Sequence, residues 1–216
     1  MRKLEVGVIG LGKFGSAVVE AVSDKGHVVV GIDNSGNSIK RNKELLRHVY
    51  QADATDIEAL KQLRLIDLDK IVVSVGKSME DAILIVLNLQ ELGIHNMAVK
   101  ACTAEHAAVL RRLGVKHVVR PELDAADRFA HRIANPGLLD LVPIGGDVLL
   151  QELEVDMWDG RSLGDLGLFE RGVMVVAIKE RGAGKYDVVP DAERILATGD
   201  ILIAVGREKD VLALIP

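Results

Sequence analysis

The chain has 216 residues, of which 49% are hydrophobic, and its formal net charge is −5. This length suits one large domain or two small ones, and the single cysteine, Cys102, excludes an internal disulfide and a cysteine-rich metal site. Because the sequence has no apolar block of membrane-spanning length, no signal-peptide pattern and no strongly basic stripe, we expect a cytoplasmic protein that does not bind nucleic acid.

The N-terminal residues predict a strand, a glycine-rich turn, a helix and a second strand. An apolar run leads into Gly10-Leu11-Gly12-Lys13-Phe14-Gly15, and a second apolar run, residues 28–32, ends at Asp33. In such a turn the first glycine permits the bend, the second lets the backbone approach a phosphate, and the third lets the helix pack on the strand. The following helix N-terminus attracts the phosphate, and a carboxylate at the strand tip can accept hydrogen bonds from both ribose hydroxyls. The pattern predicts adenine-nucleotide binding; glycines that serve packing alone are the alternative.

Up to about residue 134, short apolar runs alternate with helix patterns. We expect strands at residues 3–9, 28–32, 47–51, 70–75, 96–100 and 117–119. Thr55-Asp56-Ile57-Glu58 and Ser78 with Asp81 fit helix N-caps, and Gly26, Gly93 and Gly114 lie where helix C-terminal caps belong. Six strands alternating with helices predict an α/β fold, a Rossmann-like doubly wound parallel sheet of strand order 3-2-1-4-5-6.

Asn135-Pro136-Gly137 breaks this alternation, so we expect a nucleotide-binding domain over residues 1–136 and a small α+β domain over residues 137–216. In the second domain we expect strands at residues 148–155, 172–179, 186–189 and 200–205, with short helices at 162–168 and 209–215. This segment holds 8 Lys and Arg against 15 Asp and Glu. It is too small and too poor in His, Cys and Ser to form the substrate half of a dehydrogenase.

The helix expected over residues 79–92 is apolar almost all the way round from Ala82 to Leu87. A helix lying on a sheet at the protein surface needs only one apolar stripe, so the extra apolar faces predict a second partner. Another subunit is the favoured partner, and a charge introduced at Ile85 or Leu89 is then expected to disrupt assembly. The alternative is that the C-terminal domain of the same chain covers this helix.

Several motifs occur in an order that is similar to one known family. They are the glycine turn, the strand ending at Asp33, Ala52-Asp53-Ala54-Thr55, Ala98-Val99-Lys100-Ala101, Arg120-Pro121-Glu122, Pro190-Asp191-Ala192 and Ala197-Thr198-Gly199-Asp200-Ile201-Leu202-Ile203. Together they resemble the RCK (also called KTN) domains of the cytoplasmic regulatory subunits of bacterial Ktr- and Trk-type potassium uptake systems. The last two motifs resemble the companion C-terminal domain, so the resemblance covers essentially the whole chain.

The resemblance implies a subunit that is not an enzyme and that binds ATP or ADP. It also implies homodimers that assemble into a ring, expected to be an octamer, on the inner face of the membrane beneath an integral-membrane potassium channel or transporter. The glycine turn would cradle the phosphates, the strand tip would hold the ribose, and the segments after the third and fourth strands would frame the adenine and the cleft. The implied nucleotide contacts are Gly10, Gly12, Lys13, Phe14, Gly15, Asp33, Asn34, Ser35, Asp53, Ala54, Val75, Gly76 and Lys100.

The resemblance further implies a divalent or monovalent cation near Glu122, beside the terminal phosphates; the alternative is that Glu122 only caps a helix start. Two departures stand out. Ktr-type subunits commonly have Arg at the position of Lys13, and Lys cannot make a bidentate phosphate contact, so discrimination between ATP and ADP is expected to be weaker. Some family members bind cyclic di-AMP in the C-terminal domain, but residues 163–172 depart from that pattern, so cyclic di-AMP is not claimed as a ligand and stays an open alternative.

Two other functions share the predicted fold. An NAD-dependent oxidoreductase would use Asp33 in the same way, and that acid would repel the 2′-phosphate of NADP. None of the six histidines lies in a recognisable catalytic motif, however, and the sequence has no Tyr-x-x-x-Lys pair. An NADH-responsive regulator would need a DNA-binding segment, and no helix-turn-helix pattern is visible. NAD or NADH is therefore the alternative ligand.

Overall fold

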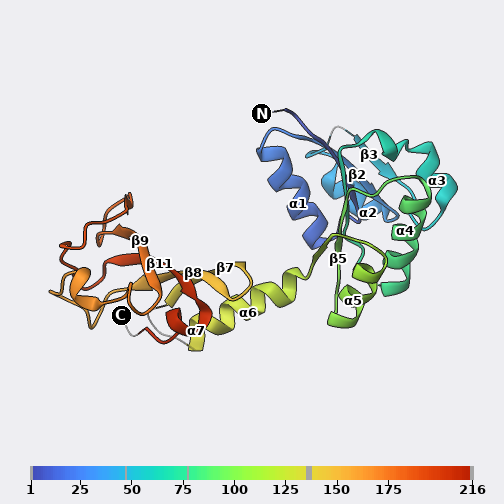
Figure 1. The fold of residues 1–216 in the computed structure, drawn as a ribbon. Helices are drawn as coiled ribbons and strands as arrows, with labels where there is room; N and C mark the ends of the chain where they lie inside the picture. Colours follow the sequence, from blue (N-terminus) through green and yellow to red (C-terminus); the bar gives the residue numbers. More distant parts are fainter. Residues whose placement is uncertain (1, 47, 77, 135–137, 215–216) are drawn as a thin grey trace. The chain divides into compact units, whose positions relative to one another are not determined.

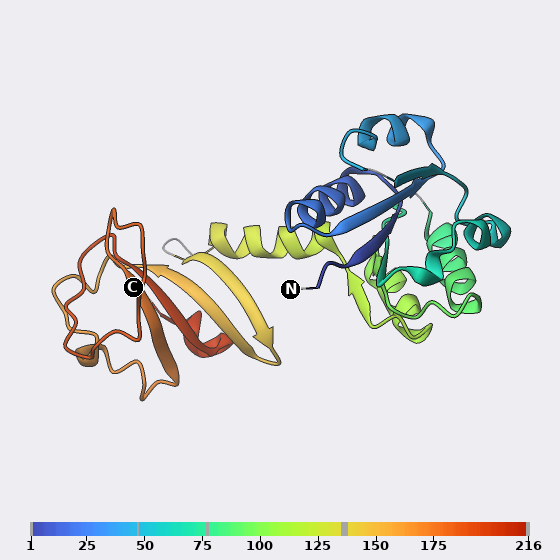
Figure 2. The ribbon, with the colours of Figure 1, turned by 90° about the horizontal axis from the view of Figure 1, so that it is seen from above.

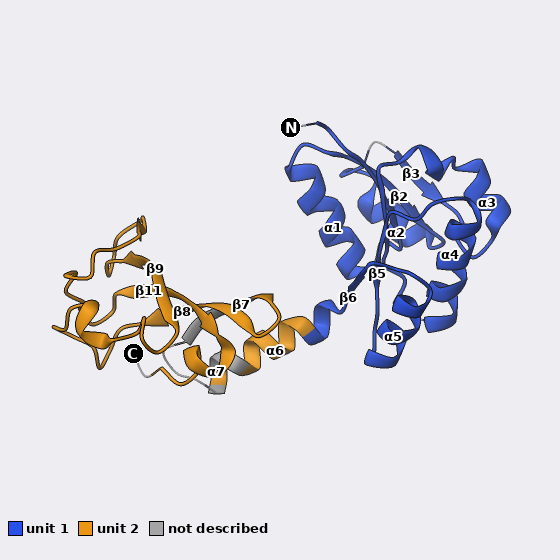
Figure 3. Cartoon of the chain, viewed as in Figure 1, with its two compact units in different colours: residues 1–123 blue, residues 124–216 orange. Residues whose placement is uncertain are grey.

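The computed structural model describes residues 2–46, 48–76, 78–134 and 138–214. The chain divides into two compact units, Met1–Leu123 and Asp124–Pro216 (Figure 3). The expected domain boundary at Asn135-Pro136-Gly137 lies outside the described residues. Of the helices in the described residues, none is both long enough and apolar enough to cross a membrane.

The first unit is built on a six-stranded parallel sheet. Its strands are β1 (Glu5–Ile9), β2 (Val28–Asp33), β3 (His48–Gln51), β4 (Lys70–Val73), β5 (Met97–Lys100) and β6 (His117–Val119). Their spatial order is β3-β2-β1-β4-β5-β6, which confirms the predicted doubly wound order. Because the order reverses between β1 and β4, the loops that follow these two strands diverge and leave room between them.

Helices cover both faces of this sheet. They are α1 (Lys13–Asp24), α2 (Gly36–Asn42), α3 (Ile57–Gln62), α4 (Met79–Glu91) and α5 (Ala104–Arg112). Figures 1 and 2 show α1 on one face and α4 and α5 on the other. Val8 packs in the apolar layer that contains Val19 of α1, whereas its neighbour Ile9 packs with Val86 of α4. Successive strand residues thus face opposite layers, which explains why the strands are continuous apolar runs.

Local sequence signals set most helix ends. Gly26, Gly93 and Gly114 have φ angles of 81°, 80° and 84°, as expected for C-terminal caps. Ser78 accepts a hydrogen bond from the Asp81 amide and caps α4, as predicted. The cap of α3 is one residue later than expected: the Asp56 carboxylate caps the helix, because the hydroxyl of the preceding threonine donates to another aspartate instead.

The second unit contains a five-stranded antiparallel sheet of order β10-β9-β11-β8-β7. Helix α6 (Pro121–Ala134) passes from the first unit into the second. The remaining elements are β7 (Leu138–Gly145), β8 (Val148–Glu154), β9 (Val173–Lys179), β10 (Asp187–Val188), β11 (Ile201–Arg207), 3-10 turns at Leu65–Asp67 in the first unit and Gly164–Leu166 in the second, and α7 (Glu208–Val211). The core of the second unit contains Leu153, Trp158, Leu196 and Leu202.

Strand β7 was not predicted, and the helix expected over residues 162–168 is only the turn Gly164–Leu166. β7 carries a proline in its sequence and follows the Asn-Pro-Gly break, so its residues read as a linker. It pairs with β8 at the edge of the sheet through an irregular register, where a strand tolerates proline. The three glycines between residues 160 and 167 account for the short helix, because glycine disfavours helix propagation.

Candidate functional site

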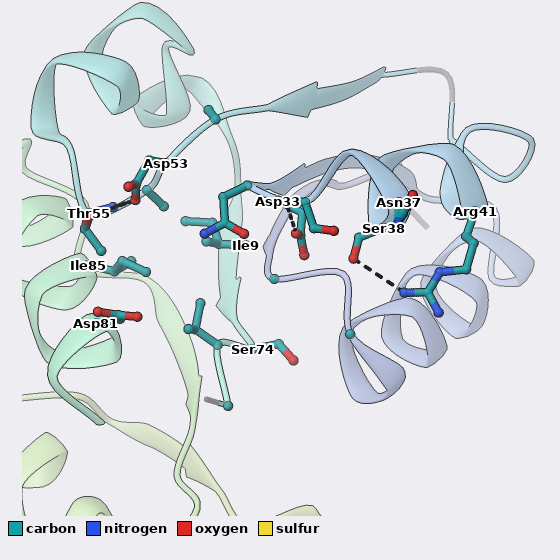
Figure 4. Close-up of a pocket in the computed structure, with 18 residues that line it drawn as sticks. Ile9, Asp33, Asn37, Ser38, Arg41, Asp53, Thr55, Ser74, Asp81 and Ile85 are labelled. Atoms are coloured by element: carbon teal, nitrogen blue, oxygen red, sulfur yellow. Dashed lines mark hydrogen bonds between the residues drawn. The ribbon is translucent and has the colours of Figure 1, made fainter. Parts of the chain in front are cut away.

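A cleft of about 660 Å3 opens at the carboxyl ends of the first four strands (Figure 4). It lies at the point where the strand order reverses, which is where open α/β sheets bind ligands. The loops after β1, β2, β3 and β4, with one side each of α2 and α4, form its walls. The lining residues are Ile9, Gly10, Gly12, Asp33, Asn34, Ser35, Asn37, Ser38, Arg41, Ala52, Asp53, Ala54, Thr55, Ser74, Val75, Gly76, Asp81 and Ile85.

The three glycines of the turn serve different purposes. Gly10 has a φ of 91°, and a Cβ there would lie 2.8 Å from the Ser74 carbonyl. A Cβ on Gly15 would lie 1.9 Å from the Gly10 carbonyl oxygen, so α1 can approach β1 only without a side chain at this position. Gly12 precedes α1, and a Cβ there would meet nothing within 4 Å. Packing therefore requires Gly10 and Gly15, whereas the backbone at Gly12 faces open space at a helix N-terminus.

These contacts predict different effects for two alanine substitutions. Gly15→Ala is expected to destabilise the first unit by about 1–3 kcal/mol or more, because the helix must move away from the strand. Gly12→Ala is expected to leave the free energy of unfolding nearly unchanged, since the methyl group meets open space. Thermal and urea unfolding of both variants measure this difference. Equal destabilisation by the two substitutions would contradict the packing described here.

Two backbone amides, from the segments on either side of the carboxylate, hold the Asp33 side chain in place at the tip of β2. Its Oδ2 accepts a hydrogen bond from the Leu11 amide at 2.6 Å, and its Oδ1 accepts one from the Ser35 amide at 2.7 Å. The carboxylate thus joins the glycine turn to the start of α2. Each oxygen retains a second lone pair, so the group can still accept hydrogen bonds from a ligand in the cleft.

The opposite wall is held by Asp53 and Thr55. Oδ1 of Asp53 accepts hydrogen bonds from the Thr55 amide at 2.9 Å and from the Thr55 hydroxyl at 2.7 Å. These hydrogen bonds, the hydroxyl one above all, lower the pKa of Asp53 below its usual value, so the carboxylate is ionised at neutral pH. Nδ2 of Asn88 in α4 donates to the Thr55 carbonyl at 2.8 Å. The loop after β3 is therefore tied to α4.

A charged pair lies beside Gly76, which is one of the residues that line this cleft. Nζ of Lys100, at the end of β5, is 2.5 Å from Oε1 of Glu122 in the first turn of α6. The Lys100 side chain is only 12% exposed, whereas that of Glu122 is 67% exposed. The ammonium lies 5.8 Å from the centroid of the Phe14 ring and 3.6 Å from where a Cβ on Gly76 would be. The hydrogen bond from Lys100 lowers the pKa of the Glu122 carboxyl.

Nine of the thirteen expected nucleotide contacts line the cleft. The other four, Lys13, Phe14, Gly15 and Lys100, lie outside the lining. Among the described residues there is no group of three or more His, Cys, Asp and Glu side chains able to hold a metal ion, and the Glu122 carboxylate is engaged by Lys100. A cation there would need further ligands, such as phosphate oxygens.

Sequence reasoning did not assign several of the lining residues to the nucleotide site. They are Ile9, Asn37, Ser38, Arg41, Ala52, Thr55, Ser74, Asp81 and Ile85. Ala52 and Thr55 belong to the Ala52-Asp53-Ala54-Thr55 motif, and the polar residues that follow Asp33 could have indicated that α2 forms a wall of the cleft. Arg41 offered no such indication, because a single arginine on a short polar helix is typical of a solvated surface. In the structure, Nη2 of Arg41 lies 3.5 Å from the Ser38 hydroxyl (Figure 4).

The fold and the cleft define the class: a Rossmann-like unit with a ligand cleft at its glycine turn, followed by a small antiparallel-sheet unit. Residues 6–121 match the TrkA-N domain and residues 150–216 match the TrkA-C domain. The chain therefore belongs to the TrkA-N/TrkA-C family of RCK-domain proteins, which confirms the resemblance carried by the sequence motifs.

Relatives of similar length carry potassium-uptake names. The chain is 35% identical to the Ktr system potassium uptake protein C of Bacillus subtilis, over 97% of this chain and 95% of that protein. It is 32% identical to the Ktr system potassium uptake protein A of Vibrio alginolyticus, over 93% of this chain and 91% of that protein.

Solved structures show the same fold. The GsuK RCK domain has a TM-score of 0.68 and 18% identity, over 98% of this chain and 47% of that one. A GsuK channel bound to NAD has a TM-score of 0.69 and 19% identity, over 100% of this chain and 40% of that one. A GsuK bound to ADP has a TM-score of 0.53 and 17% identity, over 63% of this chain and 36% of that one. The chain spans less than half the length of these solved chains.

Proposed function

We propose that this chain is a regulatory subunit of a potassium uptake system and that it binds ATP or ADP in the cleft at its glycine turn. The observation that carries the proposal is the cleft at the switch point of the sheet, where the open N-terminus of α1 and the carboxylate of Asp33 lie together at the glycine turn. Similarity to Ktr proteins over nearly the full length supports the regulatory role. The subunit would act on the cytoplasmic face, bound to an integral-membrane potassium channel or transporter.

The cleft suggests how a nucleotide would lie. The phosphates would approach the backbone at Gly12, where the α1 N-terminus offers unpaired amides and the positive end of the helix dipole. Asp33 would accept hydrogen bonds from the ribose hydroxyls. The adenine would lie toward Asp53 and Ala54, with Val75 and Gly76 forming the wall beyond β4.

The proposal includes four further expectations from the sequence analysis. A cation near Glu122 would be held jointly with the terminal phosphates. Homodimers would assemble into a ring, and the nucleotide-binding and C-terminal domains would divide near residue 136. The subunit would have no catalytic activity of its own.

NAD or NADH is the second candidate ligand. A carboxylate at the tip of β2 serves any adenosine ribose, so Asp33 does not by itself distinguish a dinucleotide from ATP. The fold is also that of a channel solved with NAD bound. Each ligand therefore belongs in the same binding experiment.

A thermal-shift panel with ATP, ADP, AMP, NADH and cyclic di-AMP tests the proposal. A ligand present at 100 times its dissociation constant stabilises the fold by about 2.7 kcal/mol, which such a scan detects. We expect stabilisation by ATP and ADP, and cyclic di-AMP is included because it tests for a second ligand in the C-terminal domain. Stabilisation by NADH alone would favour the second candidate, and a scan with no stabilising nucleotide would overturn the proposed ligand. Co-purification with an integral-membrane partner tests the regulatory role.

Lys13 is the residue proposed to distinguish ATP from ADP. It is the first residue of α1 and is exposed, so its ammonium is free to meet a third phosphate. One charge-assisted hydrogen bond of about 1.5–3 kcal/mol is enough to change the equilibrium constant between two conformations of the assembly tenfold. We expect Lys13→Ala to retain ADP binding and to lose most of the difference between the small-angle scattering profiles of the ATP and ADP forms. Lys25→Ala, beyond the other end of α1, is the control. A full difference in Lys13→Ala would mean that the switch lies elsewhere.

A further inference from the structure

A second pocket, of about 400 Å3, lies where the strands of the parallel sheet begin, at the edge opposite the cleft. Its volume falls within the range of small-molecule sites, about 300–1,000 Å3. Two lining residues precede β1, and the other three lie between α1 and β2. This pocket shares no lining residue with the cleft. Its lining residues are Arg2, Lys3, Lys25, Gly26 and His27.

The lining of this pocket is basic throughout. Apart from the glycine, each described residue that lines it is a lysine, an arginine or a histidine, whereas three aspartates and a single arginine line the cleft. Lys3 and Lys25 are both exposed. Within the part of the chain that the structure describes, neither lysine forms an ion pair. Their positive charges are therefore not neutralised by the protein.

The hydrogen bonds around the pocket leave it with donors. One Nη2 hydrogen bond of Arg2 goes to Oδ1 of Asp69 at 2.6 Å, and the guanidinium has further N–H groups. The Leu4 amide donates to Nδ1 of His27 at 3.3 Å, so the neutral imidazole carries its hydrogen on Nε2. Together with the two ammonium groups, these donors make the pocket suitable for an anion rather than for a cation or an apolar group.

We propose that this pocket binds a phosphate group, carried by a lipid headgroup or free in solution. A phosphate monoester carries up to about two negative charges and offers three acceptor oxygens, so it can accept hydrogen bonds from several of these donors at once. A carboxylate has one charge and two oxygens, and it would leave more of the donors without a partner. The site is separate from the nucleotide cleft, and this inference does not rest on the proposed function.

The topology of the sheet explains why the sequence shows no basic run at this site. Lys3 and Lys25 are separated by the whole of β1 and α1. They come together because β1 and β2 are parallel neighbours, with Glu5 opposite Val28, so that both strands begin side by side. Two short basic segments thereby form one surface.

A purely structural role is the alternative for one of these lysines. Lys25 is the C-terminal cap of α1, where a positive charge balances the partial negative charge of the last carbonyl groups. Lys3 precedes a strand and has no helix end to balance. A binding site therefore requires an effect of both lysines on ligand affinity, whereas helix balancing predicts an effect of Lys25 alone, and on stability.

Charge-removing substitutions test the site in the full chain. Near an anionic membrane surface, each Lys or Arg contributes about 1 kcal/mol, equivalent to about fivefold in affinity. We expect Lys3→Gln and Lys25→Gln each to weaken binding to phosphatidylcholine vesicles that contain phosphatidic acid about fivefold, and the double variant about 25-fold. Lys185→Gln combined with Lys209→Gln is the matched control, because both residues are exposed and belong to the second unit.

Co-sedimentation with vesicles and calorimetry with inorganic pyrophosphate distinguish the two sources of the phosphate. Losses confined to the pocket variants support the site: with the vesicles they identify a lipid headgroup, and with pyrophosphate alone a free phosphate. Wild-type protein that binds neither probe overturns the inference. An equal loss in the matched control, or a Lys25→Gln variant that changes only the melting temperature, also overturns it. Because the pocket lies outside the cleft, nucleotide binding measured in the same variants tests the proposed function separately.

Discussion

Asp33→Ala is expected to abolish measurable binding of both ATP and ADP. In the proposed complex, the carboxylate accepts hydrogen bonds from two ribose hydroxyls, and each of these charge-assisted hydrogen bonds contributes about 1.5–3 kcal/mol. The substitution also removes the acceptor of the Leu11 and Ser35 amides, so the glycine turn loses its tie to α2. Together these losses predict a fall in affinity of at least about 100-fold, which calorimetry at micromolar protein measures directly.

Two controls separate loss of binding from loss of folding. The two orphaned amides are expected to cost the folded state about 1–3 kcal/mol, so the melting temperature of Asp33→Ala must be measured alongside the affinity. Asp24→Ala removes an exposed acid at the far end of α1 and should leave both quantities unchanged. Equal nucleotide affinities in the wild type and a folded Asp33→Ala variant would contradict the proposed position of the ribose.

The sequence allowed the architecture of the first unit to be predicted because its signals are local and repeated. Buried parallel strands must be continuous apolar runs, and Gly26, Gly93 and Gly114 mark helix ends through their backbone conformation. The glycine turn was also predictable, because α1 approaches β1 so closely at Gly15 that only glycine fits there. One strand end differs from the prediction: β4 ends at Val73, two residues before the predicted end, because the chain turns away there to line the cleft.

What the sequence could not predict depends on tertiary placement. The cleft wall formed by Arg41 depends on how α2 lies against the tip of β2, which no local pattern encodes. The pair of Lys100 and Glu122 joins residues on different elements, and the family resemblance implies that both lie near the phosphates without indicating that they pair with each other. The edge strand β7 contains a proline and lies next to a turn signal, so its pairing is decided by β8 rather than by its own residues.

Helix α4 shows the same limit most clearly. The sequence shows an apolar helix without indicating which side packs on the sheet. In the structure, Ile85 and Leu89 are buried in the core of the first unit, at 2% and 0% exposure. A charge at either position would therefore disrupt the fold, which corrects the expectation that these residues test assembly. The outward side of α4 carries Leu84 and Leu87, each 44% exposed.

The outward side of α4 leads to the assembly prediction. Contiguous exposed apolar residues on a helix are typical of contact surfaces, and a second copy of this chain is the partner that the all-round apolar pattern favours. We expect the wild type to be at least a dimer at micromolar concentration. Leu84→Glu combined with Leu87→Glu is expected to weaken the dimer at least 100-fold, since two buried leucine contacts of about 1.5–3 kcal/mol each are replaced by charges that must be desolvated.

Sedimentation velocity across a concentration series measures this shift, and thermal unfolding checks that the variant retains its fold. Leu45→Glu is the matched control, because Leu45 is 51% exposed and belongs to the segment between α2 and β3, not to α4. Ile85→Asp is a second control, for loss of folding: it places a charge in the core and should therefore lower the melting temperature. A wild type that sediments as a clean monomer, or a double variant with the oligomeric state of the wild type, would show that α4 is not the contact surface between subunits.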